Sequence, residues 1–175
     1  MICENLNSGL TLDFGSADGN LHKFLLQNPD IEVIGVDISK NENVDVVHNL
    51  DKMPYPFPSN YAENIVAGEV IEHLENPLAF LKECFRILKQ KGVLIITTPN
   101  MTGLQHFLYS QKPERRHTHL YSWGIKNFKN LVGRTKFKIR KIELFTAYWN
   151  RNIFYRIVTY LIPQLRTSLF IVLEK

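Results

Sequence analysis

One stretch near the amino terminus constrains the fold more than any other, and it reads LTLDFGSADG over residues 10–19. Alternating apolar residues from Leu10 to Phe14 fit a buried strand of a parallel sheet. The glycines that follow fit a sharp turn whose backbone a ligand can approach closely. From Gly19 to Asn28 apolar residues recur at helical spacing, so the pattern predicts a strand, a loop and a helix.

A second strand is predicted over residues 31–37, and it ends in an acid, Asp37. In nucleotide-binding βαβ units an acid at the tip of the second strand accepts hydrogen bonds from ribose hydroxyls, because the first two strand ends are neighbours. Asp37 is the candidate for that role. A glycine turn followed by such an acid is also typical of nicotinamide dehydrogenases, so the glycine spacing has to separate the two classes.

The glycine spacing favours a cofactor other than a dinucleotide. A dinucleotide fingerprint has Gly-x-Gly-x-x-Gly, whereas Gly15, Ala17 and Gly19 occupy every second position after Asp13. This spacing resembles the first motif of class I S-adenosylmethionine (SAM) dependent methyltransferases, Asp-x-Gly-x-Gly-x-Gly. Ala17 departs from the middle glycine of that motif, and it adds a methyl group where the family brings its backbone close to the cofactor.

Two later segments extend the resemblance over roughly residues 10–145. Residues 53–81 resemble the family's Leu-Pro-Phe turn, strand and Glu-His-Leu before a helix. Residues 86–99 resemble its Arg-x-Leu-Lys-x-Gly-Gly approach to a strand, with Lys91 in place of the first glycine. The combination is more specific than any one motif. The chain is therefore similar to the type 11 methyltransferase domain group.

The remaining patterns predict the other elements of a single α/β domain over residues 1–175. Asn76 and Pro77 begin a helix that Gly92 ends, and a second helix runs from a cap at Ser122 to Gly133. Apolar spacing predicts a third helix over residues 154–161. Further strands are expected over residues 44–48, 61–68, 93–97, 136–144 (with a bulge near Arg140) and 169–174. We expect a doubly wound, seven-stranded, mostly parallel sheet of the Rossmann-like methyltransferase type, with an antiparallel last strand.

The resemblance also implies which residues bind SAM. Asp13 and the loop backbone would hold the methionyl end, Asp37 the ribose, and Asn49 with Leu50 the adenine. Asn49 stands where the family has an Asp; its amide oxygen can still accept a hydrogen bond, but an ordinary loop amide is an equal alternative. The full set of expected cofactor residues is Asp13, Gly15, Ser16, Ala17, Gly19, Asp37, Ile38, Asn49, Leu50 and Glu69.

Three residues are candidates for contact with the methyl acceptor: His73, His119 and Tyr121. His73 follows the fourth strand, at the edge where open α/β sheets bind ligands, and it could take a proton from a hydroxyl or an amine. In the alternative interpretation, Glu72 and His73 brace the turn into the next helix. The family often carries a His-x-x-(Tyr/Phe)-Ser stretch near His119.

The segment that precedes Tyr121 is long and rich in polar residues, which is typical of a functional loop. It also carries Lys112, Arg115, Arg116 and His117. We expect no metal site here, because no Cys or acid near His117 and His119 completes a ligand set.

Charge divides the chain into two halves. Residues 1–100 hold 7 Lys+Arg and 14 Asp+Glu, a net charge of −7, whereas residues 101–175 hold 14 and 3, a net charge of +11. We expect a cofactor half and a basic substrate half that attracts an anionic small molecule, such as a glycan or lipid precursor. A solvated basic face without a partner is the alternative. The helix near residues 151–162 either covers the sheet or contacts anionic lipid at a membrane surface.

Three other functions compete with methylation of a small molecule. An RNA methyltransferase would use the basic half, but Gly68 and Glu69 stand where an Asn-Pro-Pro-Tyr type of motif is expected, so nucleic acid is disfavoured. A SAM-binding module without catalysis fits the departures at Ala17 and Asn49. A nicotinamide dehydrogenase is disfavoured by the glycine spacing.

The first strand begins near residue 10, which leaves little room for the amino-terminal helix that usually covers the cofactor in this family. A partner subunit in a homodimer, the segment after residue 100, or an exposed cofactor are the options. Two cysteines, Cys3 and Cys84, do not suggest a disulfide framework. With no long apolar run and no signal peptide, we expect a cytoplasmic protein.

Overall fold

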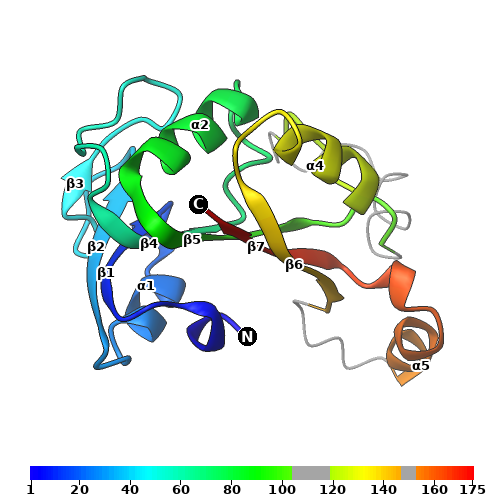
Figure 1. Cartoon of the computed structure of the whole chain (residues 1–175). Helices are drawn as coiled ribbons and strands as arrows, with labels where there is room; N and C mark the ends of the chain where they lie inside the picture. Colours follow the sequence, from blue (N-terminus) through cyan, green and yellow to red (C-terminus); the bar gives the residue numbers. More distant parts are fainter. Residues whose placement is uncertain (104–118, 147–152) are drawn as a thin grey trace.

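A computed structural model of the chain describes residues 1–103, 119–146 and 153–175 (Figure 1). Within these residues the strands form one seven-stranded sheet in the order β3-β2-β1-β4-β5-β7-β6. β1 to β5 pair in parallel, and β7 is antiparallel to both β5 and β6. This architecture confirms the predicted fold class. The strands are β1 (Gly9–Phe14), β2 (Ile31–Asp37), β3 (Val46–Val47), β4 (Ala62–Gly68), β5 (Leu88–Pro99), β6 (Lys138–Phe145) and β7 (Ser168–Glu174).

Helices cover both faces of the sheet (Figure 1). α2 and α4 pack on one face, and α1 with the amino-terminal residues packs on the other. Among the described residues, none of the helices is long and apolar enough to cross a membrane. The α-helices are α1 (Asn20–Leu25), α2 (Pro77–Ile87), α4 (Ile125–Val132) and α5 (Ile153–Leu161), and the short 3-10 turns are η1 (Cys3–Asn5), η2 (Ser16–Asp18) and η3 (Pro163–Leu165).

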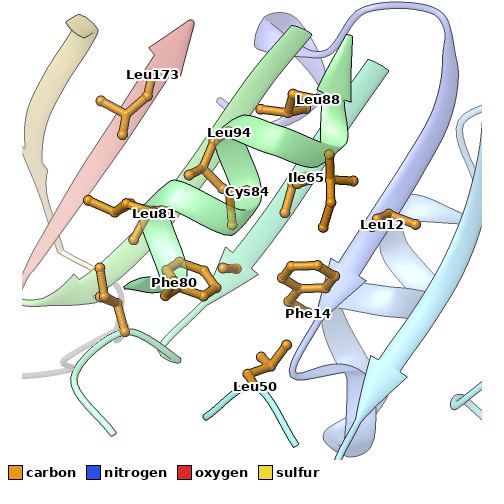
Figure 2. Close-up of a cluster of buried hydrophobic side chains, with 14 of the residues drawn as sticks. Leu12, Phe14, Leu50, Ile65, Phe80, Leu81, Cys84, Leu88, Leu94 and Leu173 are labelled. Carbon is orange, nitrogen blue, oxygen red and sulfur yellow. The ribbon is translucent and has the colours of Figure 1, made fainter. Parts of the chain in front are cut away.

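The larger core lies between the sheet and α2 (Figure 2). Phe14, the last residue of β1, contacts three aromatic rings at the loop end of the strand, with centroid distances of 5.7 Å to Tyr55, 6.4 Å to Phe57 and 6.2 Å to Phe80. The rings of Tyr55 and Phe80 meet Phe14 edge to face and that of Phe57 is stacked on it, and such pairs restrict the relative positions of the rings. The core therefore reaches the edge of the sheet at which the loops begin, and it fixes the end of β1.

The helix α2 begins as predicted but ends earlier. The Asn76 side chain accepts a hydrogen bond from the Ala79 N–H at 3.0 Å, and Pro77 occupies the first turn. The helix ends at Ile87 instead of Gly92, because Leu88 is extended and pairs with Ala62 of β4. The predicted end was wrong, since helical spacing cannot show that a residue already belongs to the next strand.

Smaller differences concern three other elements. β3 has two residues instead of five, and α1 ends at Leu25 instead of near residue 28. α4 begins after Gly124, whose N–H donates to the Asn127 side chain at 2.6 Å, so the predicted cap at Ser122 was wrong. The predicted bulge in β6 is confirmed, because the register with β7 shifts between Ile139 and Lys141.

Candidate functional site

The loop after β1 turns sharply at two glycines in the left-handed region of the backbone map, with φ 85° at Gly15 and 71° at Gly19. A methyl group on Gly15 would lie 2.5 Å from Cγ2 of Val70, and one on Gly19 would lie 2.4 Å from Nδ2 of Asn43. Both positions therefore require glycine. Ala17 lies between them without a positive φ, so its side chain adds no backbone strain at the family's middle glycine.

The carboxylate of Asp37 connects the end of β2 to this loop. Its Oδ2 accepts a hydrogen bond from the Ala17 N–H at 3.2 Å, and its Oδ1 accepts one from the Ser39 N–H at 3.0 Å. An ionised carboxylate has about four acceptor positions, so these two bonds leave room for ligand hydroxyls. The next residue, Ile38, leaves 63% of its surface exposed beside Asp37.

A turn after β2 supports the loop from behind, through two contacts that were not predicted from the sequence. The Asn41 side chain donates to the Ala17 carbonyl at 2.8 Å, and the Ser16 hydroxyl donates to the Asn43 carbonyl at 3.0 Å. Within the turn, the Asn41 side chain accepts a hydrogen bond from the Asn43 N–H at 2.8 Å. An Asn-x-Asn sequence in the short connection after a strand is typical of such an Asx turn, and this signal could have marked both residues.

Asp13 lies beneath the loop and not on its surface. The residue is 1% exposed, and its Oδ2 lies 3.2 Å from Nδ1 of His22, a buried residue of α1. The pair fastens the first helix to the first strand, directly under the glycine turn. A buried carboxylate needs such a partner, because an unpaired one would carry a large desolvation cost.

The residues after β3 make a second, tighter turn. The Asn49 side chain accepts a hydrogen bond from the Asp51 N–H at 2.9 Å, which leaves the second lone pair of its amide oxygen for a ligand. Leu50 is only 8% exposed and packs in the core with Phe14 (Figure 2). Its carbonyl accepts a hydrogen bond from the Tyr55 hydroxyl at 2.6 Å.

Two carboxyl groups lie at the end of β4. Burial and the nearby charge of Glu72 raise the pKa of Glu69 to about 7, and Glu69 itself has a positive φ of 55°. Burial likewise raises the pKa of Glu72, which is fully buried, to about 7. The Thr98 hydroxyl donates to Oε2 of Glu72 at 2.9 Å. Oε1 of Glu72 is buried without a hydrogen-bond partner among the described residues.

The three residues predicted to contact the acceptor come together around this turn. The rings of His73 and His119 lie 4.6 Å apart, edge to face. The Tyr121 hydroxyl donates to the Glu75 carbonyl at 3.1 Å, and the N–H groups of Leu120 and Tyr121 donate to the Glu72 carbonyl at 2.8 and 3.2 Å. The predicted loop residues Lys112, Arg115, Arg116 and His117 lie outside the described residues.

All of the predicted site residues that the structure describes lie at or shortly after the carboxyl ends of β1, β2, β3 and β4, or beside the turn after β4. In an open α/β sheet this edge is the place of ligand binding, next to the point where the strand order reverses. The fold and the site thus define a nucleoside-binding domain of the Rossmann-like class. The match to the family described as a methyltransferase domain extends over residues 4–142, so the chain belongs to that family. This confirms the resemblance inferred from the motifs.

The sequence similarity to individual relatives extends over shorter segments of the chain. A probable S-adenosylmethionine-dependent methyltransferase of Mycolicibacterium smegmatis is 43% identical over 58 residues, which cover 33% of this chain and 22% of the relative. The mitochondrial ubiquinone biosynthesis O-methyltransferase of Rattus norvegicus is 46% identical over 44 residues, which cover 25% of this chain and 13% of the relative. The chain therefore matches about a fifth or less of the length of these curated relatives.

The fold agrees over the whole chain with a solved structure. A SAM-dependent methyltransferase of Archaeoglobus fulgidus superimposes with a TM-score of 0.73 at 21% sequence identity, over 99% of this chain and 89% of the other. At 21% sequence identity, this similarity is evidence for a shared fold alone.

Proposed function

We propose that this chain is a SAM-dependent methyltransferase domain that acts on a small-molecule acceptor. The observation that carries the proposal is the joined pair of loops at the ends of β1 and β2. A turn that requires glycine at Gly15 and Gly19 lies beside a partly exposed acid, Asp37. The carboxylate of Asp37 can accept further hydrogen bonds beyond the two that it already accepts. Such a pair suits a ligand with a ribose and a compact polar tail, so the residues fit the cofactor that the family implies.

Each part of the site has a task in this proposal. The backbone from Gly15 to Gly19 binds the methionyl end above the buried Asp13, Asp37 accepts hydrogen bonds from the ribose, and Ile38 contacts the adenine. Asn49 binds the adenine edge through its remaining lone pair, and Leu50 supports that turn from the core. Glu69 borders the site from the end of β4. When bound, SAM supplies a methyl group on a sulfonium, and the protein's contribution is to position the acceptor and exclude water.

In this proposal His73, on the turn after β4, faces the acceptor together with His119 and Tyr121, which lie in the segment before α4. Either imidazole can orient an acceptor hydroxyl or accept its proton. The proximity of the three residues supports this assignment. The rings of His73 and His119 are in contact, and the backbone at Tyr121 is hydrogen-bonded to the turn after β4.

An anionic or lipid-linked acceptor is the class that we favour. The net charge of +11 over residues 101–175 supports an anionic group. The names of two relatives refer to ubiquinone biosynthesis and to demethylmenaquinone, which supports a lipid-linked acceptor. On α5 and after it, four large apolar residues are exposed and suit contact with a membrane surface: Ile157, Tyr160, Leu161 and Ile162. We also place the chain in the cytoplasm, where free cysteines such as Cys3 and Cys84 persist.

Calorimetry with S-adenosylhomocysteine tests the cofactor assignment. We expect micromolar binding to the wild type and none to Asp37→Ala. Asp30→Ala is the matched control, because Asp30 precedes the opposite end of β2, and it should bind like the wild type. Stabilisation by NADH but not by S-adenosylhomocysteine would instead assign the chain to dehydrogenases.

A transfer assay tests catalysis separately. Radiolabelled SAM is incubated with extracts of polar metabolites, of lipids and of RNA, and the label should enter the lipid or the anionic metabolite pool. Label in RNA would favour the nucleic-acid alternative. Tight binding of S-adenosylhomocysteine without transfer to any pool would indicate a binding module without catalysis.

A further inference from the structure

We propose that Glu72, His73 and His119 form a binding site for a divalent transition-metal ion such as Zn²⁺. One ligand atom from each residue lies within 4.8 Å of the other two. Zinc binds nitrogen and oxygen ligands at about 2.1 Å in tetrahedral geometry, so two of its ligands lie about 3.4 Å apart. Both imidazoles are exposed, so in this proposal their side chains rotate toward the carboxylate to close the remaining distance.

The ligand types select the class of ion. Two imidazoles and one carboxylate make up a ligand set that is typical of zinc sites with an open coordination position. Imidazole also suits the neighbouring first-row ions, whereas Mg²⁺ and Ca²⁺ prefer oxygen ligands throughout. Three protein ligands leave at least one position for a water molecule or for an oxygen of a bound small molecule.

The buried carboxylate of Glu72 is the strongest evidence that this cluster binds an ion. The Thr98 hydroxyl holds Oε2 in place, while Oε1 is buried with no hydrogen-bond partner among the described residues. Buried polar atoms without a partner are rare in folded proteins and call for an explanation. A cation at this position would satisfy the carboxylate, and the bond from Thr98 would act as the outer contact that orients a ligand.

The backbone brings the third ligand to the other two. Two N–H groups of the chain after His119, those of Leu120 and Tyr121, donate to the carbonyl of Glu72. His119 is thereby held beside His73 although the two residues are distant in the sequence. No metal site was expected from the sequence, because no Cys or acid near His117 and His119 along the chain completes a ligand set. The folded chain instead supplies Glu72, which follows β4.

The place of this cluster suggests what the ion does. Val70, on the same turn, lies against Gly15, so the cluster adjoins the loop to which we assign the cofactor. An ion there would bind an oxygen of the acceptor and favour loss of its proton to solvent water, and the imidazoles would serve as ligands instead of bases. This role rests on the proposed function; the ion site itself does not.

Metal binding can be measured without any enzymatic assay. Protein without an affinity tag is treated with EDTA, dialysed, and titrated with Zn²⁺ by calorimetry and with Co²⁺ by visible absorption. We expect one ion per chain. His73→Ala, His119→Ala and Glu72→Gln should each weaken binding at least tenfold, while His48→Ala and Glu75→Gln, matched controls outside the cluster, should bind like the wild type.

Two results would overturn the inference: no binding at 100-fold excess of either ion over protein, or binding that His73→Ala and His119→Ala leave unchanged. Far-ultraviolet circular dichroism shows whether each variant is folded, and both histidines are exposed, so their removal should not unfold the chain. Calorimetry with S-adenosylhomocysteine in EDTA separates the two proposals. If the ion fails to bind and the nucleoside binds, only the metal site is wrong; the reverse result contradicts the proposed function alone.

Discussion

The carboxylate of Asp37 accepts a hydrogen bond from the backbone N–H of Ala17 at 3.2 Å, which joins the end of β2 to the loop after β1. The same side chain also accepts a hydrogen bond from Ser39. One residue therefore shapes the loop and presents its remaining lone pairs at the sheet edge. Binding and local structure are therefore coupled through this carboxylate.

Replacement of Asp37 should lower stability as well as affinity. Asp37→Ala removes the acceptor of two backbone N–H groups, and we expect a loss of about 1–2 kcal/mol in the free energy of unfolding. Asp37→Asn retains one acceptor oxygen and should lie between the alanine variant and the wild type. Urea unfolding followed by circular dichroism measures both values. An unchanged midpoint for Asp37→Ala would show that the two hydrogen bonds contribute nothing to stability.

Gly15→Ala should destabilise the chain by about 2–3 kcal/mol, since the new methyl group meets Val70 in a backbone conformation that alanine rarely adopts. The double variant Gly15→Ala/Val70→Ala removes the collision but keeps the backbone strain. It should therefore lose less than the sum of the two single variants in a thermodynamic cycle. Strictly additive losses would contradict the close approach of Val70 to Gly15.

His22→Leu should cost about 2–3 kcal/mol, because it leaves the carboxylate of Asp13 buried without its imidazole partner. His22→Leu/Asp13→Leu removes the charge as well and should recover part of that loss. Thermal unfolding of the four proteins gives the coupling between the side chains. If the double variant is less stable than His22→Leu by the full cost of Asp13→Leu, then the pair is not coupled.

An ion pair holds the proline-rich loop of residues 51–60 against α2 and should make stability depend on pH. Glu83 accepts two hydrogen bonds from Arg86 and one from the Tyr55 N–H, and the bonds from Arg86 are the largest cause of its lowered pKa. A carboxyl group with a lowered pKa in the folded state stabilises the fold above its unfolded pKa, which is close to 4.5. That stabilisation is lost as the pH falls through the folded pKa.

Glu83→Gln should therefore cost about 1–2 kcal/mol at pH 7, and the loss should shrink as the pH falls below 4.5, because the charge-dependent stabilisation of the wild type is lost as the pH falls through the lowered pKa of Glu83. Urea unfolding at several pH values between 3 and 7 measures the difference. Glu75→Gln, an exposed position before the same helix, is the control. Equal losses at both ends of the pH range would show that the charge of Glu83 is not responsible.

Much of the fold was predictable because its signals are local. The strand, glycine turn and helix of residues 9–25, the acid at the end of β2, and the bulge at Arg140 each leave a short periodic pattern. The end of α2 leaves no such local pattern. The helix ends at Ile87 because Leu88 pairs with Ala62 of β4, although Leu88 still fits the helical spacing of apolar residues. Contacts between distant segments overrule local preference in such cases.

Sequence motifs allow candidate site residues to be named, but not the contacts that support them. Gly15 and Asp37 belong to single motifs and so became candidates, whereas Asn43 did not, because its contact with Ser16 depends on the packing of two loops. The approach of His119 to Glu72 is likewise a property of the folded chain, set by hydrogen bonds between the segments that carry them.

A crystal structure with S-adenosylhomocysteine bound would test the central claim most directly. We predict that the nucleoside spans the ends of β1 and β2, with its ribose hydroxyls at hydrogen-bond distance, about 2.6–3.2 Å, from the carboxylate of Asp37. Its amino-acid end should lie on the backbone from Gly15 to Gly19. Density for the ligand elsewhere on the molecule, with side chains closed over that glycine turn, would contradict the account.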